Sequence, residues 1–218
     1  MAIESEDLNL FLEFRKNNFH GKKCAILGDC KIYNNNLESL CSLMGFEQID
    51  TFDINGNPTF KVNLNEELPN IFFNKYDWII DSGTLYCCFD TSTVLKNILY
   101  MLKDDGCIIH TSNLVGFFGR GFYSLSPALF RDFYKINNFD ILCFATKTRI
   151  NKNWVVNDYN NTYLSETSSQ NEILFQEQSG NYVTLIPNDS LMLYFVKRKV
   201  RTDFKKPIPE HFIITNGK

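Results

Sequence analysis

Residues 22–33 read KKCAILGDCKIY, a short apolar run closed by a glycine. The run Cys24–Leu27 does not alternate between apolar and polar residues, which indicates a strand covered on both faces, as in parallel sheets. The next segment, Leu37–Met44, has apolar residues at helical spacing and stops at Gly45. We therefore expect a buried strand, a turn at Gly28 and a helix, which together begin a βαβ unit.

The alternation of strand and helix patterns continues along the chain. Further strands are expected at Gln48–Ile54, Thr59–Leu64, Tyr76–Ile80, Cys107–His110, Asp140–Thr148 and Leu191–Lys199. Further helices are expected at Asp7–Phe19, at 94–102 behind a cap at Asp90, Thr91 or Ser92, and after the Ser126-Pro127 cap. This order is typical of a Rossmann-like α/β fold: a doubly wound, mostly parallel seven-stranded sheet with helices on both faces.

We expect residues 1–218 to form a single domain, because this length is close to that of one generous domain. It would contain an N-terminal helix at 1–21, a cofactor-binding core at 22–150, a last strand at 189–200 and a tail at 201–218. The polar stretch Asn151–Asn188 is interpreted as a lid, an insertion with its own hairpin or a mobile loop, since structureless loops of that length are uncommon.

The net charge of −3 argues against a nucleic-acid-binding surface, which is normally basic. A local exception lies near the end of the chain, where the basic residues are Lys197, Arg198, Lys199, Arg201, Lys205 and Lys206. Anion or polynucleotide binding is one interpretation of this cluster. We favour a charged edge strand that discourages pairing between sheets.

Seven cysteines without a Cys-x-x-Cys pair favour a reduced, cytoplasmic setting over a disulfide framework or a zinc site. The first residues, MAIESEDLNLF, have neither the basic nor the apolar region of a signal peptide. No window approaches the roughly 20 apolar residues that a membrane-spanning helix needs. We therefore expect a cytoplasmic protein with no metal site and no membrane partner.

Candidate site residues gather at the carboxyl ends of the predicted strands, where open α/β sheets bind their ligands. They are Gly28-Asp29, Asp53, Asn63, Asp81-Ser82-Gly83 and His110. Each residue alone would be unremarkable, but their concentration at strand ends predicts a binding site. His110 is the candidate catalytic residue, because a histidine can accept a proton near neutral pH. A histidine packed at a strand end is the alternative.

Asp53 is the most informative of these residues, since a carboxylate at the end of the second strand can accept hydrogen bonds from both ribose hydroxyls. It follows Gly28 by 25 residues, near the spacing of about 20 found in nucleotide-binding sheets. A turn aspartate before Asn55-Gly56 is the alternative. The Gly28–Lys31 loop lacks the repeated glycines of a pyrophosphate cradle, which disfavours NAD and FAD but not S-adenosylmethionine (SAM).

Several stretches resemble motifs of class I SAM-dependent methyltransferases, and in particular a bacterial group of methyltransferase-domain proteins. They are AILGDCKIY at 25–33, NLNEELP at 63–69, YDWIIDSGTLYCCFD at 76–90, GCIIHT at 106–111 and GFYSLSP at 121–127. The resemblance spans approximately His20 to Ile150. It implies SAM as the cofactor, with the methionine end near Gly28, Asp29 and Asp81–Gly83, the ribose at Asp53, and the adenine near Ile54, Asn63 and Leu64.

The resemblance implies methyl transfer to an oxygen or nitrogen of a small-molecule or glycan-like acceptor. Two positions depart from the family pattern: Tyr86-Cys87 replaces Glu-His after Gly-Thr-Leu, and Arg120 replaces the His before Gly-Phe-Tyr. These departures motivate an alternative, a non-catalytic SAM-binding module that retained the fold. Nucleic-acid methylation is less expected, because residues 81–84 are not the Asp/Asn-Pro-Pro-Tyr sequence that holds a flipped adenine.

Overall fold

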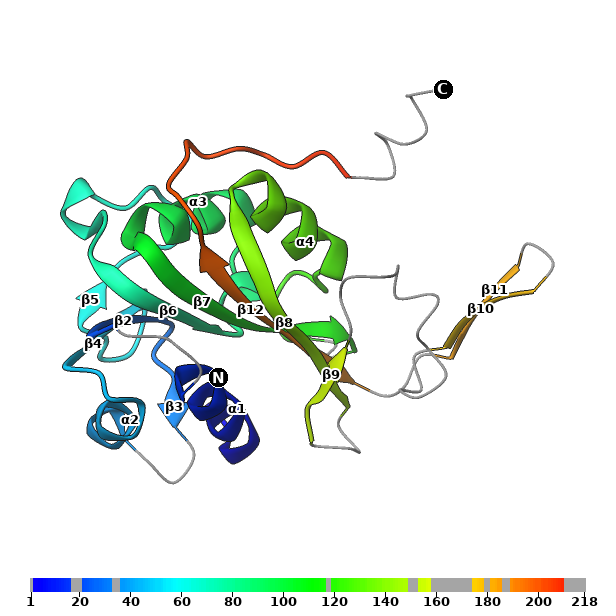
Figure 1. Ribbon diagram of the computed structural model, residues 1–218, viewed down its shortest axis with the longest axis horizontal. Helices are drawn as coiled ribbons and strands as arrows, with labels where there is room; N and C mark the ends of the chain where they lie inside the picture. Colours follow the sequence, from blue (N-terminus) through cyan, green and yellow to red (C-terminus); the bar gives the residue numbers. More distant parts are fainter. Residues whose placement is uncertain are drawn as a thin grey trace.

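The computed structural model describes residues 2–16, 21–32, 36–116, 119–148, 153–157, 174–178, 181–185 and 189–209. Within them, one eight-stranded sheet forms the centre of the molecule (Figure 1). Its strands, in spatial order, are β5 (Phe60–Lys61), β4 (Gln48–Asp53), β2 (Lys23–Leu27), β6 (Tyr76–Ser82), β7 (Leu102–Val115), β12 (Ser190–Arg198), β8 (Phe139–Thr148) and β9 (Val155–Asn157).

The five strands β5, β4, β2, β6 and β7 run parallel to one another, while β12 is antiparallel to both of its neighbours, β7 and β8. From β2 the chain moves outward to β4 and β5, and then returns to β6 on the other side of β2. The strand order therefore reverses between β2 and β6. The predicted Rossmann-like, mostly parallel sheet is confirmed, with the three-residue β9 as an eighth strand.

Helices cover both faces of this sheet (Figure 1). On one face lie α1 (Ser5–Lys16) and α2 (Leu37–Met44), and on the other lie α3 (Thr91–Met101) and α4 (Pro127–Ile136). Of the three candidate caps for α3, Asp90 accepts from the backbone N–H of Thr93. Ser126 accepts from Ala128 and caps α4, as predicted. Gly45 ends α2 in the left-handed conformation, with φ 66°.

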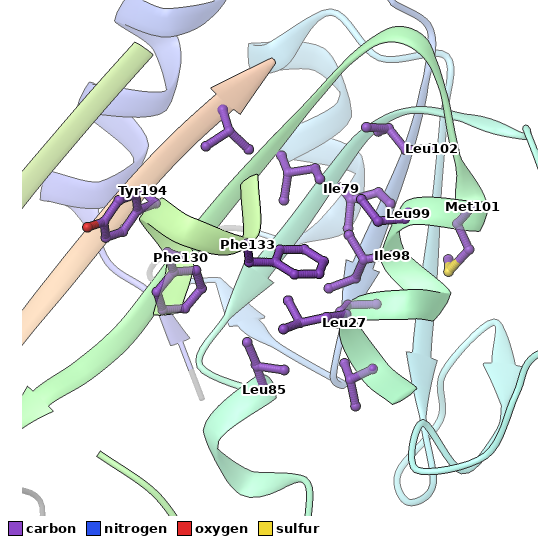
Figure 2. Packing of buried hydrophobic residues seen from close by; sticks show 14 of the residues in the cluster. Leu27, Ile79, Leu85, Ile98, Leu99, Met101, Leu102, Phe130, Phe133 and Tyr194 are labelled. Carbon is purple, nitrogen blue, oxygen red and sulfur yellow. The ribbon is translucent and has the colours of Figure 1, made fainter. Parts of the chain in front are cut away.

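The alternation of side chains along β2 divides the core into two clusters. Cys24 and Ile26 face α1 and α2, whereas Ala25 and Leu27 face α3 and α4. Figure 2 shows the second cluster, in which Leu27 packs with residues of α3 and α4 such as Ile98 and Phe133. Because both faces of β2 are covered, its apolar run needs no polar side, as expected of a central parallel strand.

Two differences from the predicted elements concern strand lengths. The strand expected at Thr59–Leu64 is only two residues long, β5. The strand expected at Cys107–His110 extends over Leu102–Val115 and begins where α3 ends. Two further strands of two residues each, β1 (Ala2–Ile3) and β3 (Lys31–Ile32), pair in parallel as a separate small sheet. This pairing holds the start of the chain against the loop after β2.

The prediction of a charged edge strand at the end of the chain is wrong. β12 lies between β7 and β8, so it has no free edge. Arg198 is buried and donates to the carbonyls of Leu99 and Leu102, at the carboxyl end of α3. Arg201 also donates to Leu102. These two basic residues therefore satisfy helix carbonyls that have no partner within the helix.

The stretch Asn151–Asn188 is described only in part. β10 (Leu174–Gln178) and β11 (Asn181–Leu185) form a separate antiparallel pair within it. The prediction of a helix to Phe19 falls partly on residues 17–20, which lie outside the described part of the chain. None of the helices in the described residues is both long enough and apolar enough to cross a membrane.

Candidate functional site

The carboxyl ends of four adjacent parallel strands meet along one edge of the sheet. Leu27 of β2 is in register with Phe52 of β4 on one side and with Asp81 of β6 on the other. Ser82 of β6 is in register with Thr111 of β7. Gly28 and Gly83 follow β2 and β6 directly and Asp53 is the last residue of β4, so the topology brings these predicted residues to the same edge. The reversal of strand order between β2 and β6 is where such sheets bind ligands.

The turn after β2 depends on Gly28, whose φ of 93° is accessible to glycine but strained for other residues. Its N–H donates to the carbonyl of Phe52 at 2.7 Å. The hydroxyl of Thr84 donates to the carbonyl of Leu27 at 2.6 Å. These two bonds join the turn to β4 on one side and to the loop after β6 on the other.

The carboxylate of Asp53 stands at the end of β4. Its Oδ2 accepts from the N–H of Asp29 at 2.6 Å, and its Oδ1 accepts from the N–H of Asn55 at 2.9 Å. Asp53 therefore has the role of a turn aspartate, which was the alternative that the sequence left open. A carboxylate has about four acceptor positions, so these two bonds leave room for two hydroxyl donors. Ile54, the next residue, is 53% exposed and offers an apolar surface beside the carboxylate.

The other residues expected near an adenine take part in local structure. Leu64 is buried in the core cluster that includes Phe52 and Phe72. Asn63 forms a turn, in which its Oδ1 accepts from the N–H of Asn65 and its amide group donates to Glu66. Asp29 likewise accepts from the N–H of Asn57 at 3.1 Å. Of this set, Ile54 presents the most exposed apolar side chain.

Asp81 and His110 belong to one buried hydrogen-bond network at the end of β6 and within β7. Asp81 is fully buried, and its Oδ1 accepts from the N–H groups of Thr84 and Leu85. Its Oδ2 lies 2.7 Å from Nδ1 of His110, and Nε2 of His110 is hydrogen-bonded to the hydroxyl of Tyr134 in α4. The neutral histidine tautomer with the proton on Nδ1 satisfies all three groups, with Tyr134 as the second donor.

The contacts of His110 favour the alternative, a packed histidine, over a general base, and the catalytic role stays a prediction. The His110 side chain is 1% exposed and both ring nitrogens are occupied, so neither can reach an acceptor in this arrangement. Burial raises the pKa of Tyr134 further above its usual value, which keeps its hydroxyl protonated as a donor at neutral pH. The alternative of a packed histidine describes the position of His110. The Asp81 side chain is likewise fully buried.

Tyr134→Phe should lower the free energy of unfolding by about 1–3 kcal/mol, because it leaves the buried Nε2 of His110 without a partner. Tyr123→Phe is the matched control. Its hydroxyl also donates to a single acceptor, the carbonyl of Phe89, but at an exposed position. Urea denaturation of the two variants checks the difference. Equal stabilities would contradict the buried network.

A cavity of about 350 Å³ opens beside the ends of β6 and β7. Ser82 and Gly83, two of the predicted residues, line it. The others lining it are Glu4, Asp7, Tyr86, Thr111, Arg120, Lys147, Trp154 and Leu191. Tyr86 and Arg120, where the chain departs from the family pattern, thus face the same space.

The charged residues on one wall of this cavity come from distant parts of the chain. Lys147 of β8 contacts Asp7 at 2.7 Å and Glu4 at 3.4 Å. Nε1 of Trp154 donates to the same Asp7 oxygen at 2.8 Å. Sequence reasoning missed all four residues. Glu4 and Lys147 are 143 positions apart, and neither belongs to a local motif.

No protein-family model matches the chain, and no curated protein matches it in sequence. Solved structures do match. A chain of the complex between a methyltransferase activator and a methyltransferase of Haloferax volcanii has a TM-score of 0.53 and 13% identity, covering 90% of each chain. A Listeria monocytogenes protein assigned as a SAM-dependent methyltransferase has a TM-score of 0.52 and 11% identity, covering 88% of this chain and 98% of its own.

A SAM-dependent methyltransferase of Mesorhizobium loti is matched at 13% identity over 47% of this chain and 51% of its own length, with a TM-score of 0.34. The chain therefore spans about half the length of that protein. The first two similarities establish the architecture. The chain has the fold of class I SAM-dependent methyltransferases.

Proposed function

We propose that the protein is a SAM-dependent methyltransferase acting on an oxygen or nitrogen of a small-molecule or glycan-like acceptor. One observation carries the proposal. The Asp53 carboxylate, the exposed Ile54 and the Gly28 turn stand together at the strand ends where the sheet order reverses. The methyltransferase fold of the neighbouring structures supports it.

The residues at this edge fit SAM better than a dinucleotide. Asp53 would accept the ribose hydroxyls with its remaining lone pairs, and Ile54 would contact the adenine. Gly28 is the only glycine in the loop 28–32, so the loop is not built to surround a pyrophosphate. Ser82 and Gly83, at the end of β6, line the 350 Å³ cavity, which would take the acceptor.

When held by Asp53, Ile54 and the Gly28 turn, SAM would supply an electrophilic methyl group on its sulfonium centre, and the acceptor would give up a proton. The protein's main task is then to hold donor and acceptor in line, which can account for a large part of a rate enhancement. Because His110 is enclosed, the proton would leave through the open side of the cavity to solvent.

Asp53→Ala should weaken binding of S-adenosylhomocysteine, the demethylated product of SAM, by about 1.5–3 kcal/mol, because a charge-assisted contact to the ribose is lost. Asp77→Ala is the matched control. Asp77 also accepts from two backbone N–H groups, those of Lys22 and Lys23, but at the amino end of β6. Calorimetry with each full-length variant checks the difference.

The outcomes separate the candidate functions. Unchanged affinity in Asp53→Ala would contradict the ribose role, and no binding of SAM or its product to the unmodified protein would contradict the proposed cofactor. Tight binding without methyl transfer to a broad panel of oxygen and nitrogen acceptors would favour the non-catalytic module. Matching losses in Asp53→Ala and Asp77→Ala would indicate a general effect of destabilisation.

A further inference from the structure

On one wall of the cavity beside β6 and β7, the described residues include two carboxylates and one cation. Lys147 faces the carboxylates of both Asp7 and Glu4. Asp7 is buried and fully engaged: Oδ1 accepts from Lys147 and Trp154, and Oδ2 accepts from the N–H of Glu4. The ammonium group of Lys147 is therefore paired mainly with the carboxylate of Asp7.

Glu4 is the carboxylate that remains available on this wall. Its side chain is 52% exposed, and its contact with Lys147 is the longer of the two, 3.4 Å against 2.7 Å. Lys147 also lies 4.6 Å from the centre of the Trp154 ring, which holds it against the protein. A cationic group entering the cavity would meet an incompletely neutralised carboxylate at Glu4.

Arg120 supplies the opposite charge. Its side chain is exposed, and it forms no ion pair within the residues that the structure describes. The loop that carries it is seated on Tyr86: the N–H of Phe122 donates to the carbonyl of Tyr86 at 2.9 Å, and a Cβ at Gly121 would collide with the Tyr86 ring. This close packing directs the loop, and Arg120 with it, to the cavity.

The two charges select the ligand. A ligand with only an anionic group would bring it near Glu4 and Asp7, and a ligand with only a cationic group would bring it near Arg120 and Lys147. We propose that the acceptor is a small zwitterion, whose ammonium group binds Glu4 and whose carboxylate binds Arg120. A cavity of about 350 Å³ suits a molecule of amino-acid size, and a polymer would have to remain largely outside it.

This inference rests on the proposed function, and the test therefore begins with it. Calorimetry first measures S-adenosylhomocysteine binding to the full-length protein. The loaded protein is then titrated with L-tyrosine and L-histidine, each beside its decarboxylated amine (tyramine, histamine) and its deaminated acid (3-(4-hydroxyphenyl)propionate, imidazolepropionate). We expect at least one amino acid to bind roughly tenfold tighter than both of its analogues, since each analogue loses one charge-assisted contact.

Two variants assign the contacts. Glu4→Gln should remove the preference over the deaminated acid, and Arg120→Gln should remove the preference over the amine. Glu47→Gln and Lys22→Gln, an exposed ion pair far from the cavity, are the charge-matched controls and should change neither preference. Affinity for S-adenosylhomocysteine should stay within about twofold in all four variants, since none of these side chains is assigned to the cofactor.

Several results would overturn the proposal. The first is equal binding of an amino acid and either analogue, and the second is no binding of either amino acid by protein that binds S-adenosylhomocysteine. A loss of S-adenosylhomocysteine affinity in Glu4→Gln and Arg120→Gln would assign the cavity to the methionine end of the cofactor instead. If the unmodified protein binds no S-adenosylhomocysteine, the proposed function fails, while the amino-acid titrations still report on the cavity.

Discussion

Arg198→Met is expected to lower the free energy of unfolding by about 2–4 kcal/mol, since it leaves buried backbone carbonyls at the end of a helix without their donor. Arg198 donates to Leu99 and Leu102 at 2.5 Å each, and both carbonyls belong to the last turn of α3 or its cap. Burial lowers the pKa of Arg198 to about 10, so it remains charged at neutral pH. Of these two carbonyls, Arg201 donates to that of Leu102, so the carbonyl of Leu99 loses its arginine partner.

Urea denaturation of Arg198→Met, Arg198→Lys and Lys199→Met tests this role. Lysine keeps the charge but lacks the forked donors, so it should recover only part of the loss. Lys199 is the next residue in sequence, and its ion pair with Asp140 is about half exposed, so Lys199→Met should cost at most about 1 kcal/mol. An equal effect at positions 198 and 199 would contradict the capping role.

Asp81→Ala is expected to have the larger effect, about 3–5 kcal/mol, because it removes one acceptor from three buried donors. Two of these donors are the N–H groups of Thr84 and Leu85, which begin the short helix η2 (Leu85–Cys87). The third is His110. Because Gly83 and Tyr86 of the same loop line the cavity, the variant should also weaken acceptor binding.

Asp90→Ala is the control for Asp81→Ala. Asp90 also accepts from backbone at the start of a helix, but at an exposed position, and losing such a cap costs about 1 kcal/mol. The two variants are compared by urea denaturation at one pH, and Asp81→Asn adds a shape-preserving replacement. A stability loss in Asp81→Ala no greater than that in Asp90→Ala would show that the buried network is dispensable.

Most of the fold could be predicted because its signals are local. The apolar run before Gly28, a helix cap at one of residues 90–92 and the cap at Ser126 depend on residues within a few positions of one another. The length of the strand expected at Thr59–Leu64 could not be predicted from local signals. Only Phe60 and Lys61 pair with β4, and the length of an edge strand depends on the partner it meets.

The site residues divide according to the side of the strand on which they lie. Successive side chains of a strand point to opposite faces. Asp81 therefore lies under α4 with His110, whereas the next residues, Ser82 and Thr111, line the cavity. The sequence placed Asp81 and Ser82 correctly at the end of β6, but it predicted that the next strand ends at His110, whereas β7 continues to Val115. It also could not tell which face leads to open space, because both faces are buried along β6 and β7.

The sequence by itself determined the order of strands and helices, the turn at Gly28 and the carboxylate at Asp53, since each follows from neighbouring residues. Only the tertiary structure decided that the basic last strand enters the sheet between β7 and β8, and that Glu4 and Lys147 share a cavity with Arg120. β12 pairs with residues 42 to 90 positions earlier in the chain, and Glu4 and Lys147 are 143 positions apart. These contacts arise from the packing of the whole sheet, which no local pattern encodes.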